Sequence, residues 1–299
     1  MKVILATDGS QHAEEAAWLL AHLPHSDKLE LTVIYVSNSI RLQGSSSELT
    51  RLRERVAKEE KAVAEKISQH VKEIFEGANA ALDLVVLEGQ VGSSILQLAE
   101  ACKSELIVIG AIGHSMFERM LGSVSDYVAT HAKCSVLLVR PTGLSKRKRP
   151  IEMCFAQDES SDSAAAIKQV ASFGWGASTH IDVVGVFTLP FIYSEIPHEL
   201  DLAELKKSIE QSVDLAAEQL RNLSPHVQTH ILYGNHAGDA LVEFAKKHGS
   251  DIIVLGKSNQ DWIDRLILGS TSRYVLRHAT CSIWITRTNP SKNELAKTG

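Results

Sequence analysis

The chain has 299 residues, a formal net charge of −5 with neutral histidines, and a sequence pI of about 6.2. Apolar residues make up 44% and charged residues 22%, the composition of a globular protein with room for two domains. The mildly acidic balance gives no overall electrostatic signal for binding nucleic acid. No apolar run reaches the ~18 residues of a membrane helix, and the N-terminal apolar run is too short for a signal peptide. We therefore expect a cytoplasmic protein without a nucleic-acid or membrane partner.

In the first half, short β-branched runs alternate with helical patterns. Strands are expected at residues 2–7, 29–36, 82–88, 105–110 and 135–139. Helices are expected at residues 11–22, 47–76, 92–102 and 123–132, and Ser10 is a suitable N-cap for the first of them. This alternation predicts an α/β fold, a doubly wound domain with a parallel sheet and helices on both faces.

The second half repeats the first. The stretch "VIGAIGHSMFERMLGSVSDYVATHAKCSVLLVR", residues 108–140, aligns with "VLGKSNQDWIDRLILGSTSRYVLRHATCSIWITR", residues 254–287. The aligned cysteines Cys134 and Cys281 are 281 − 134 = 147 residues apart, which is half the chain. The second set of strands is expected at residues 151–156, 180–187, 227–233, 251–256 and 281–286. The pattern indicates a tandem duplication of a whole domain rather than a solenoid.

The segment "PTGLSKRKRP" lies between the two copies and carries four successive basic residues. A basic run at a domain boundary favours a solvated linker over a nucleic-acid patch. We predict domain 1 over residues 1–142, a basic linker over 143–150, domain 2 over 151–288 and a polar tail over 289–299.

Cysteine and histidine spacing argues against a metal held by protein ligands. The four cysteines form no C-x-x-C pair and have no zinc-ligand spacing, so they are expected to be reduced and mostly buried. The 13 histidines form no H-E-x-x-H pattern. His226 and His230 are four residues apart, but they lie on an expected strand and would share no helical face.

Glycines and hydroxyls follow the fourth strand of the first copy. The loop from Gly110 to Gly122 leads into a helix that begins near Ser123. Glycine lets the backbone approach a ligand, and a helix N-terminus offers free N–H groups and partial positive charge. These features suit a phosphate group. Neither a P-loop nor a G-x-G-x-x-G fingerprint is present, and the same glycines could equally serve a tight turn and a capped helix.

Both halves resemble the universal stress protein family. The resemblance rests on the early aspartate in "TDGS" and on the late pattern G-x-x-G, nine residues, then G-S or G-T. It implies two tandem domains, each a five-stranded parallel sheet of strand order 3-2-1-4-5, packed about an internal pseudo-twofold. The last strands, "SVLLV" and "SIWIT", would pair across that axis, and a homodimer is a further possibility. Many members with the glycine motif bind ATP, whereas a branch without it does not.

The resemblance assigns nucleotide-binding positions residue by residue. In domain 1 they are Asp8, Val36, Gly110, Gly113, Gly122, Ser123, Val124 and Ser125. In domain 2 they are Asp158, Val186, Gly256, Gly269, Ser270 and Ser272. The resemblance implies that the aspartate contacts the adenosine end and the valine backbone meets adenine. The glycines and hydroxyls would surround the phosphates.

Both halves depart from the family pattern. Eight residues instead of nine separate Gly113 from Gly122, whereas the second half keeps nine but has Asn259 in place of the second glycine. Asp261 and Asp264 in the second loop would repel phosphates. Domain 1 is therefore expected to be the better nucleotide site.

The leading functional hypothesis is a stress-response protein that binds ATP or a related adenine nucleotide as a regulatory ligand. Mg²⁺ could arrive with the phosphates, and the protein partner that responds to the nucleotide is unknown. One alternative is a nucleotide-free interaction or scaffold protein. The other is a slow ATPase, which ranks last because no general base is evident and no catalytic residue is assigned.

Overall fold

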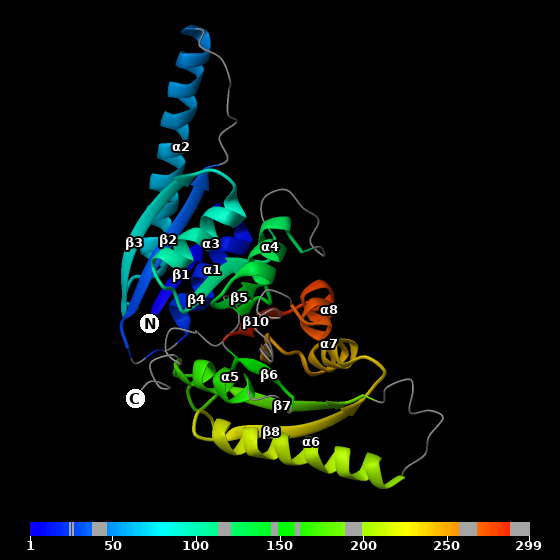
Figure 1. Ribbon diagram of the computed structural model, residues 1–299. Coiled ribbons are helices and arrows are strands. Elements are labelled where there is room, and N and C mark those ends of the chain that lie inside the picture. The colour runs from blue at the N-terminus through cyan, green and yellow to red at the C-terminus, as the bar shows by residue number, and fades with distance from the viewer. Residues whose placement is uncertain are drawn as a thin grey trace, which may run out of the picture.

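The computed structural model describes residues 1–23, 25, 27–37, 47–112, 121–144, 149–158, 162–188, 199–256 and 268–287. Within these ranges the ten strands form one continuous sheet (Figure 1), in the order β3-β2-β1-β4-β5-β10-β9-β6-β7-β8. Neighbouring strands are parallel except at the centre, where β5 and β10 are antiparallel. Each half therefore has the predicted order 3-2-1-4-5, and the predicted pairing of the two last strands is confirmed.

The strands and helices follow the expected alternation. The strands are β1 Lys2–Ala6, β2 Leu29–Ser37, β3 Ala80–Glu88, β4 Leu106–Gly110, β5 Ser135–Val139, β6 Glu152–Gln157, β7 His180–Phe187, β8 His226–Tyr233, β9 Ile252–Gly256 and β10 Ser282–Thr286. The helices are α1 Gln11–His22, α2 Ser47–Ile74, α3 Val91–Ala101, α4 Ser123–His131, α5 Asp162–Ala171, α6 Glu199–Leu220, α7 Ala237–His248 and α8 Ser270–His278.

Helices cover both faces of the sheet. One hydrophobic cluster joins the sheet to α1, α2, α5 and α6, and a second joins it to α3, α4, α7 and α8. Corresponding helices of the two halves thus lie on the same face, as a pseudo-twofold perpendicular to the sheet requires (Figure 1). Central strands β4, β5 and β10 are buried throughout, which explains why they read as unbroken apolar runs.

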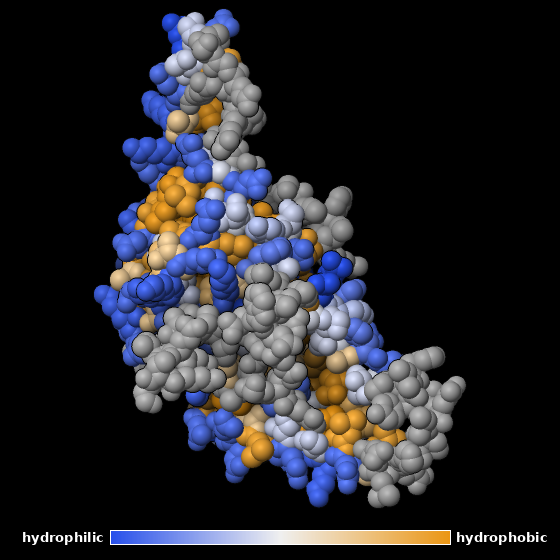
Figure 2. Space-filling model, in the orientation of Figure 1, coloured by the Kyte–Doolittle hydropathy of each residue, from blue (hydrophilic) through white to orange (hydrophobic). Residues whose placement is uncertain are grey.

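The two edge strands and the long helix α2 are more exposed. In the edge strand β3 the side chains of Leu84 and Val86 are exposed, and Figure 2 shows apolar surface over β2 and β3 of domain 1. The free end of α2 extends beyond the sheet (Figure 1), and its described side chains are buried only from Ala64 onward. No helix in the described ranges combines the length and the apolar character needed to cross a membrane.

Aromatic packing fills the centre of the domain junction. In the antiparallel pair, Trp284 of β10 lies opposite Leu137 of β5. The Trp284 side chain is 1% exposed and packs edge-on against Phe173, with ring centroids 5.4 Å apart. Burial of this much apolar area is worth several kcal/mol, since a large side chain contributes about 2–3 kcal/mol. Each of the two hydrophobic clusters contains residues of both halves, so the halves share one core rather than being linked as independent domains.

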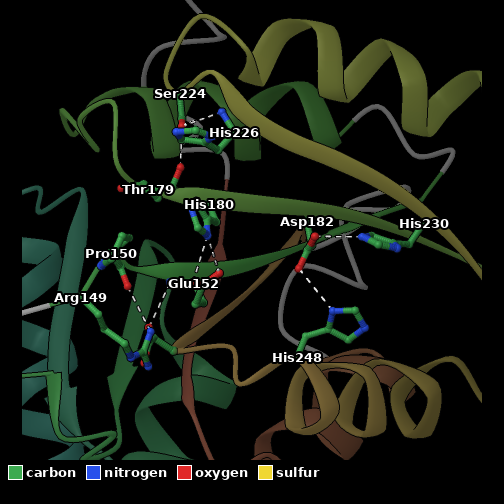
Figure 3. Close-up of polar contacts among 11 residues, drawn as sticks. Arg149, Pro150, Glu152, Thr179, His180, Asp182, Ser224, His226, His230 and His248 are labelled. Atoms are coloured by element: carbon green, nitrogen blue, oxygen red, sulfur yellow. Dashed lines mark hydrogen bonds and ion pairs between the residues drawn. The ribbon is translucent and has the colours of Figure 1, made fainter. Parts of the chain in front are cut away.

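The end of the basic linker is fixed to domain 2 by an ion pair (Figure 3). Arg149 Nη1 and Nη2 donate to Asp251 Oδ2 and Oδ1 at 2.7 and 2.6 Å. The same carboxylate accepts from Glu152 N at 3.0 Å, and Asp251 is 1% exposed. Arg149 therefore does not stand free in solvent, as the expectation of a solvated linker implied, because it neutralises a buried carboxylate.

Removing this carboxylate should destabilise domain 2. Asp251→Ala leaves a half-buried arginine without its partner, so we expect the free energy of unfolding to fall by about 3–5 kcal/mol in urea titrations. Glu100→Ala is the control, because it removes an exposed partner of Lys133 and should cost less than about 1 kcal/mol. Equal, small losses in the two variants would contradict this assignment.

The cysteines are free thiols and three of them are buried, as the spacing predicted. Cys134, Cys154 and Cys281 are buried, whereas Cys102 is partly exposed. Burial raises the pKa of Cys134 to about 11 and that of Cys281 to about 12, and it raises the pKa of Cys154 well above its usual value. These three thiols are therefore protonated and unreactive near neutral pH.

Thiol reactivity should follow this division. With an aromatic disulfide reagent at about pH 8, we expect the native protein to react rapidly at Cys102 alone. In denaturant all four thiols should react. Rapid native modification at Cys134 or Cys281 would show that the domain junction opens readily.

Candidate functional site

The assigned residues of domain 1 that the structure describes lie near the carboxyl ends of β1, β2 and β4. Strand β1 pairs with β2 on one side and with β4 on the other, so the chain connections diverge at the boundary between β1 and β4. Asp8 follows β1, Val36 lies near the end of β2, and Gly110 ends β4. Ligands of doubly wound folds bind at such a switch point. The sheet thus brings together residues that are up to 102 positions apart in the sequence.

The turn after β1 orients Asp8. Asp8 is exposed, and its Oδ1 accepts a hydrogen bond from Ser10 N at 3.0 Å. Ser10 Oγ accepts from Ala13 N at 3.3 Å, which confirms Ser10 as the N-cap of α1. Gly9 has φ of 74°, a conformation that glycine adopts without strain. A local turn therefore sets the direction of the carboxylate beside α1.

Gly110 is required by packing. A Cβ at this position would lie 2.9 Å from the carbonyl carbon of His12 and 3.0 Å from Ala13 N. Both atoms belong to the backbone of α1, so the absent side chain lets this helix approach the end of β4. Packing thus accounts for the glycine whether or not a ligand binds.

Gly122 and Ser125 fix the start of α4. Gly122 is its N-cap, and the Gly122 N–H donates to Ala111 O at 2.9 Å. Ser125 Oγ lies 2.9 Å from Gly110 O and 3.0 Å from Ala111 O, and this side chain is 3% exposed. The Ser125 hydroxyl therefore holds the helix to the end of β4. Ser123, by contrast, is exposed, and Val124 follows it in the first turn, where backbone N–H groups have no intrahelical partner.

Domain 2 repeats this arrangement with two differences. Asp158 follows β6, Val186 lies in β7, Gly256 ends β9, and Gly269 is the N-cap of α8, followed by exposed Ser270 and buried Ser272. A Cβ on Gly269 would meet nothing within 4 Å among the described atoms. The first turn of α8 carries no acidic residue, and Arg273 occupies the place that Asp126 has in α4. Gly113 and Asn259 lie outside the described residues.

A cavity of about 200 Å³ lies beside this edge of domain 1, between α1 and α2. Thr7, Gly9, Lys66 and Ile67 are among the residues that line it. Tyr35 of β2 lies near this edge, and burial, with further contributions from the Glu60 and Asp8 carboxylates, raises the pKa of its hydroxyl. A protonated tyrosine hydroxyl is a hydrogen-bond donor at this end of the site.

Two glycine–tyrosine contacts were missed by sequence reasoning. A Cβ on Gly92 would lie 2.6 Å from Tyr127 Cδ1, and one on Gly238 would lie 2.9 Å from Tyr274 Cβ. These glycines let α3 and α7 pack closely against α4 and α8. The repeat carried the signal, since the tyrosines align between the copies and the glycines have nearly the same offset.

Histidines and carboxylates cluster on β6, β7 and β8 of domain 2 (Figure 3). His230 Nε2 lies 2.8 Å from Asp182 Oδ1, His248 Nδ1 lies 3.9 Å from Asp182 Oδ2, and His180 pairs with Glu152. Strand periodicity places His180, Asp182 and His230 on one face of the sheet, and His248 reaches Asp182 from the end of α7. Among the residues that the structure describes, no three such side chains are arranged to hold a metal ion.

The fold and these edges define a class: a two-domain α/β protein with a candidate anion-binding helix end in each half. The Universal stress protein family matches residues 1–140 and 152–287. The chain belongs to the universal stress protein family, with one family domain in each half.

Individual relatives agree with this assignment. A universal stress protein of Methanocaldococcus jannaschii is 33% identical over 141 residues, which cover 46% of this chain and 81% of the relative. Universal stress protein YxiE of Bacillus subtilis is 30% identical over 149 residues, 46% of this chain and 98% of the relative. The crystal structure of a universal stress protein from Archaeoglobus fulgidus matches with a TM-score of 0.60 and 18% identity, covering 96% of both chains. That similarity extends the shared fold over both halves.

Replacing single glycines by alanine should show which glycine is needed for packing in the absence of a ligand. Gly110→Ala pushes a methyl group against the α1 backbone, so we expect it to lower the free energy of unfolding by about 1–3 kcal/mol. Gly234→Ala is the control, because its added Cβ would make only ordinary contact, 3.4 Å from Ala240 Cβ, and it should change the free energy of unfolding by less than about 0.5 kcal/mol. Chemical denaturation of both variants without nucleotide is the measurement, and a stable Gly110→Ala variant would show that α1 can move away.

Proposed function

We propose that this universal stress protein binds ATP or a related adenine nucleotide as a regulatory ligand, mainly in domain 1. Asp8 and the backbone of Val36 would contact the adenosine end. Backbone N–H groups of Ser123 and Val124 would contact the phosphates, and Mg²⁺ would accompany them. The resemblance also assigns Gly113 to the phosphate end.

The observation that carries this proposal is the convergence at the switch point. Asp8, Val36 and the start of α4 come from three separate segments and meet at one edge. The Ser125 hydroxyl fixes the start of α4 to the end of β4, so the N–H groups are held in place before any ligand arrives. Preorganisation of this kind lowers the cost of binding.

The charges at the two helix ends bear on the choice of domain. Asp126 is acidic and lies in the first turn of α4, where it weakens the attraction for phosphate, whereas α8 has Arg273 at that position. In domain 2 the carboxylates of Asp261 and Asp264 would repel phosphate, and Asn259 replaces the second glycine of the motif. We keep domain 1 as the main site because its loop retains both glycines of the first pair.

The alternative is a scaffold that binds no nucleotide. The packing of Gly110 against α1 favours it, since that contact explains this glycine without any ligand. A slow ATPase is the third possibility, and formation of ADP in the presence of Mg²⁺ would identify it.

The first test is the nucleotide content of the purified protein. The full chain is prepared without added nucleotide and denatured, and the released small molecules are identified by chromatography and mass. We expect adenine nucleotide near one per chain if domain 1 is occupied. If none is released, ATP is titrated by calorimetry, and a flat titration at millimolar ATP would favour the scaffold.

Two matched charge substitutions identify the domain that binds ATP. Asp126→Asn removes a carboxylate from the first turn of α4, so we expect ATP affinity to rise by about two- to fivefold, more at low salt. Arg273→Gln is the matched change at the same position of α8 and should leave that affinity unchanged. Weaker binding in Arg273→Gln with no effect of Asp126→Asn would move the site to domain 2.

A further inference from the structure

Arg287, which follows the last strand of domain 2, reaches into domain 1. Its Nη1 donates to Cys134 O at 3.2 Å, and its Nη2 donates to Ala129 O in the last turn of α4. Its backbone N donates to Ser135 Oγ at 2.8 Å. The side chain is buried, with 4% of its surface exposed.

Arg140 makes the mirror-image contact from domain 1. Its Nη2 donates to Leu276 O in the last turn of α8 at 3.1 Å, and its backbone N donates to Ser282 Oγ at 3.1 Å. Arg140 is 6% exposed. Arg140 and Arg287 are 147 residues apart, and so are the residues that accept their hydrogen bonds, Leu276 and Ala129. The two reciprocal contacts therefore follow from the repeat.

The partners of these guanidinium groups are backbone carbonyls rather than carboxylates. Burial lowers the pKa of Arg287 to about 10 and also lowers the pKa of Arg140, so both contacts have a desolvation cost. Among the described residues, Nε of each arginine has no hydrogen-bond partner. The unpaired carbonyls and the negative dipole end of a helix C-terminus compensate the buried charge. Each arginine therefore matches a helix end specifically.

The held helices are the ones that begin at the candidate nucleotide sites. Helix α4 has nine residues, so its phosphate-facing start and its arginine-bound end are only ~14 Å apart. Ser125 fixes the start to β4, and Arg287 fixes the end to domain 2. Helix α8 has the same length, with Arg140 at its end.

We propose that Arg287 and Arg140 are positioning residues that couple the two halves, each setting the nucleotide-site helix of the opposite domain. This inference rests on the proposed function. A phosphate that binds the start of α4 and shifts this helix along its axis would change the contact with Arg287 and, through β10, affect domain 2. The phosphate site and the arginine that responds to it are thus in different domains.

Hydrogen exchange tests the positioning without any ligand. In the full chain, Arg287→Met should speed amide exchange in α4 of domain 1, whereas Arg140→Met should speed it in α8 of domain 2. The two variants are matched controls, because both remove a buried arginine at the same junction. If either methionine variant does not fold, Arg→Lys keeps the charge and one donor at that position. Faster exchange in both helices in each variant, or in neither, would overturn the proposal.

ATP affinity supplies the readout that a purely structural role would not move. We expect Arg287→Met to weaken ATP binding at domain 1 by about fivefold or more, and Arg140→Met to leave that binding unchanged. Arg149→Met destabilises domain 2 through a different contact and should also leave it unchanged. Equal weakening in all three variants would mean that affinity follows stability alone, which overturns coupling.

Failure of the proposed function has a different signature. If the wild-type chain binds no ATP, the nucleotide proposal fails and coupling between nucleotide sites fails with it. Faster amide exchange in α4 of Arg287→Met and in α8 of Arg140→Met would then still support positioning of each helix by the opposite domain. Any other pattern of amide exchange would overturn the positioning as well.

Discussion

The antiparallel pairing of β5 with β10 determines how the two halves are placed relative to each other. It joins two parallel half-sheets into one sheet and buries a strand edge that each half would otherwise expose. Because it reverses strand direction, the carboxyl ends of the two halves lie at opposite edges of the sheet. The two candidate sites therefore cannot bind the same ligand molecule. Any coupling between them has to pass through the junction, where Trp284, Arg140 and Arg287 are buried.

Close backbone packing and ligand access make overlapping demands at the glycines. Gly110, Gly92 and Gly238 are each pressed against another element, so their lack of a side chain is explained by helix packing. Gly269 has open space around it among the described atoms. A glycine motif that marks this family thus contains positions of different physical character, and the motif alone does not show which half binds a nucleotide.

Much of the fold could be predicted from the sequence because the repeat doubled every signal. Unbroken apolar runs such as "LIVIG" marked buried parallel strands, and Ser10 marked the start of α1. The reach of Arg287 to Ala129 could not be read, because a cross-domain contact depends on register and on the turn after β10. Asp182 and His230 were missed for a related reason: neighbours across strands are visible only once the strand order is known.

The proposed occupation of the domain 1 switch point by an adenine nucleotide can be tested with a crystal structure of the full chain grown with millimolar ATP and Mg²⁺. We expect nucleotide density with its phosphates at the start of α4 and its adenosine end near Asp8 and Val36. Density only at the start of α8 would contradict the choice of domain, and well-ordered edges without density in either half would contradict nucleotide binding itself.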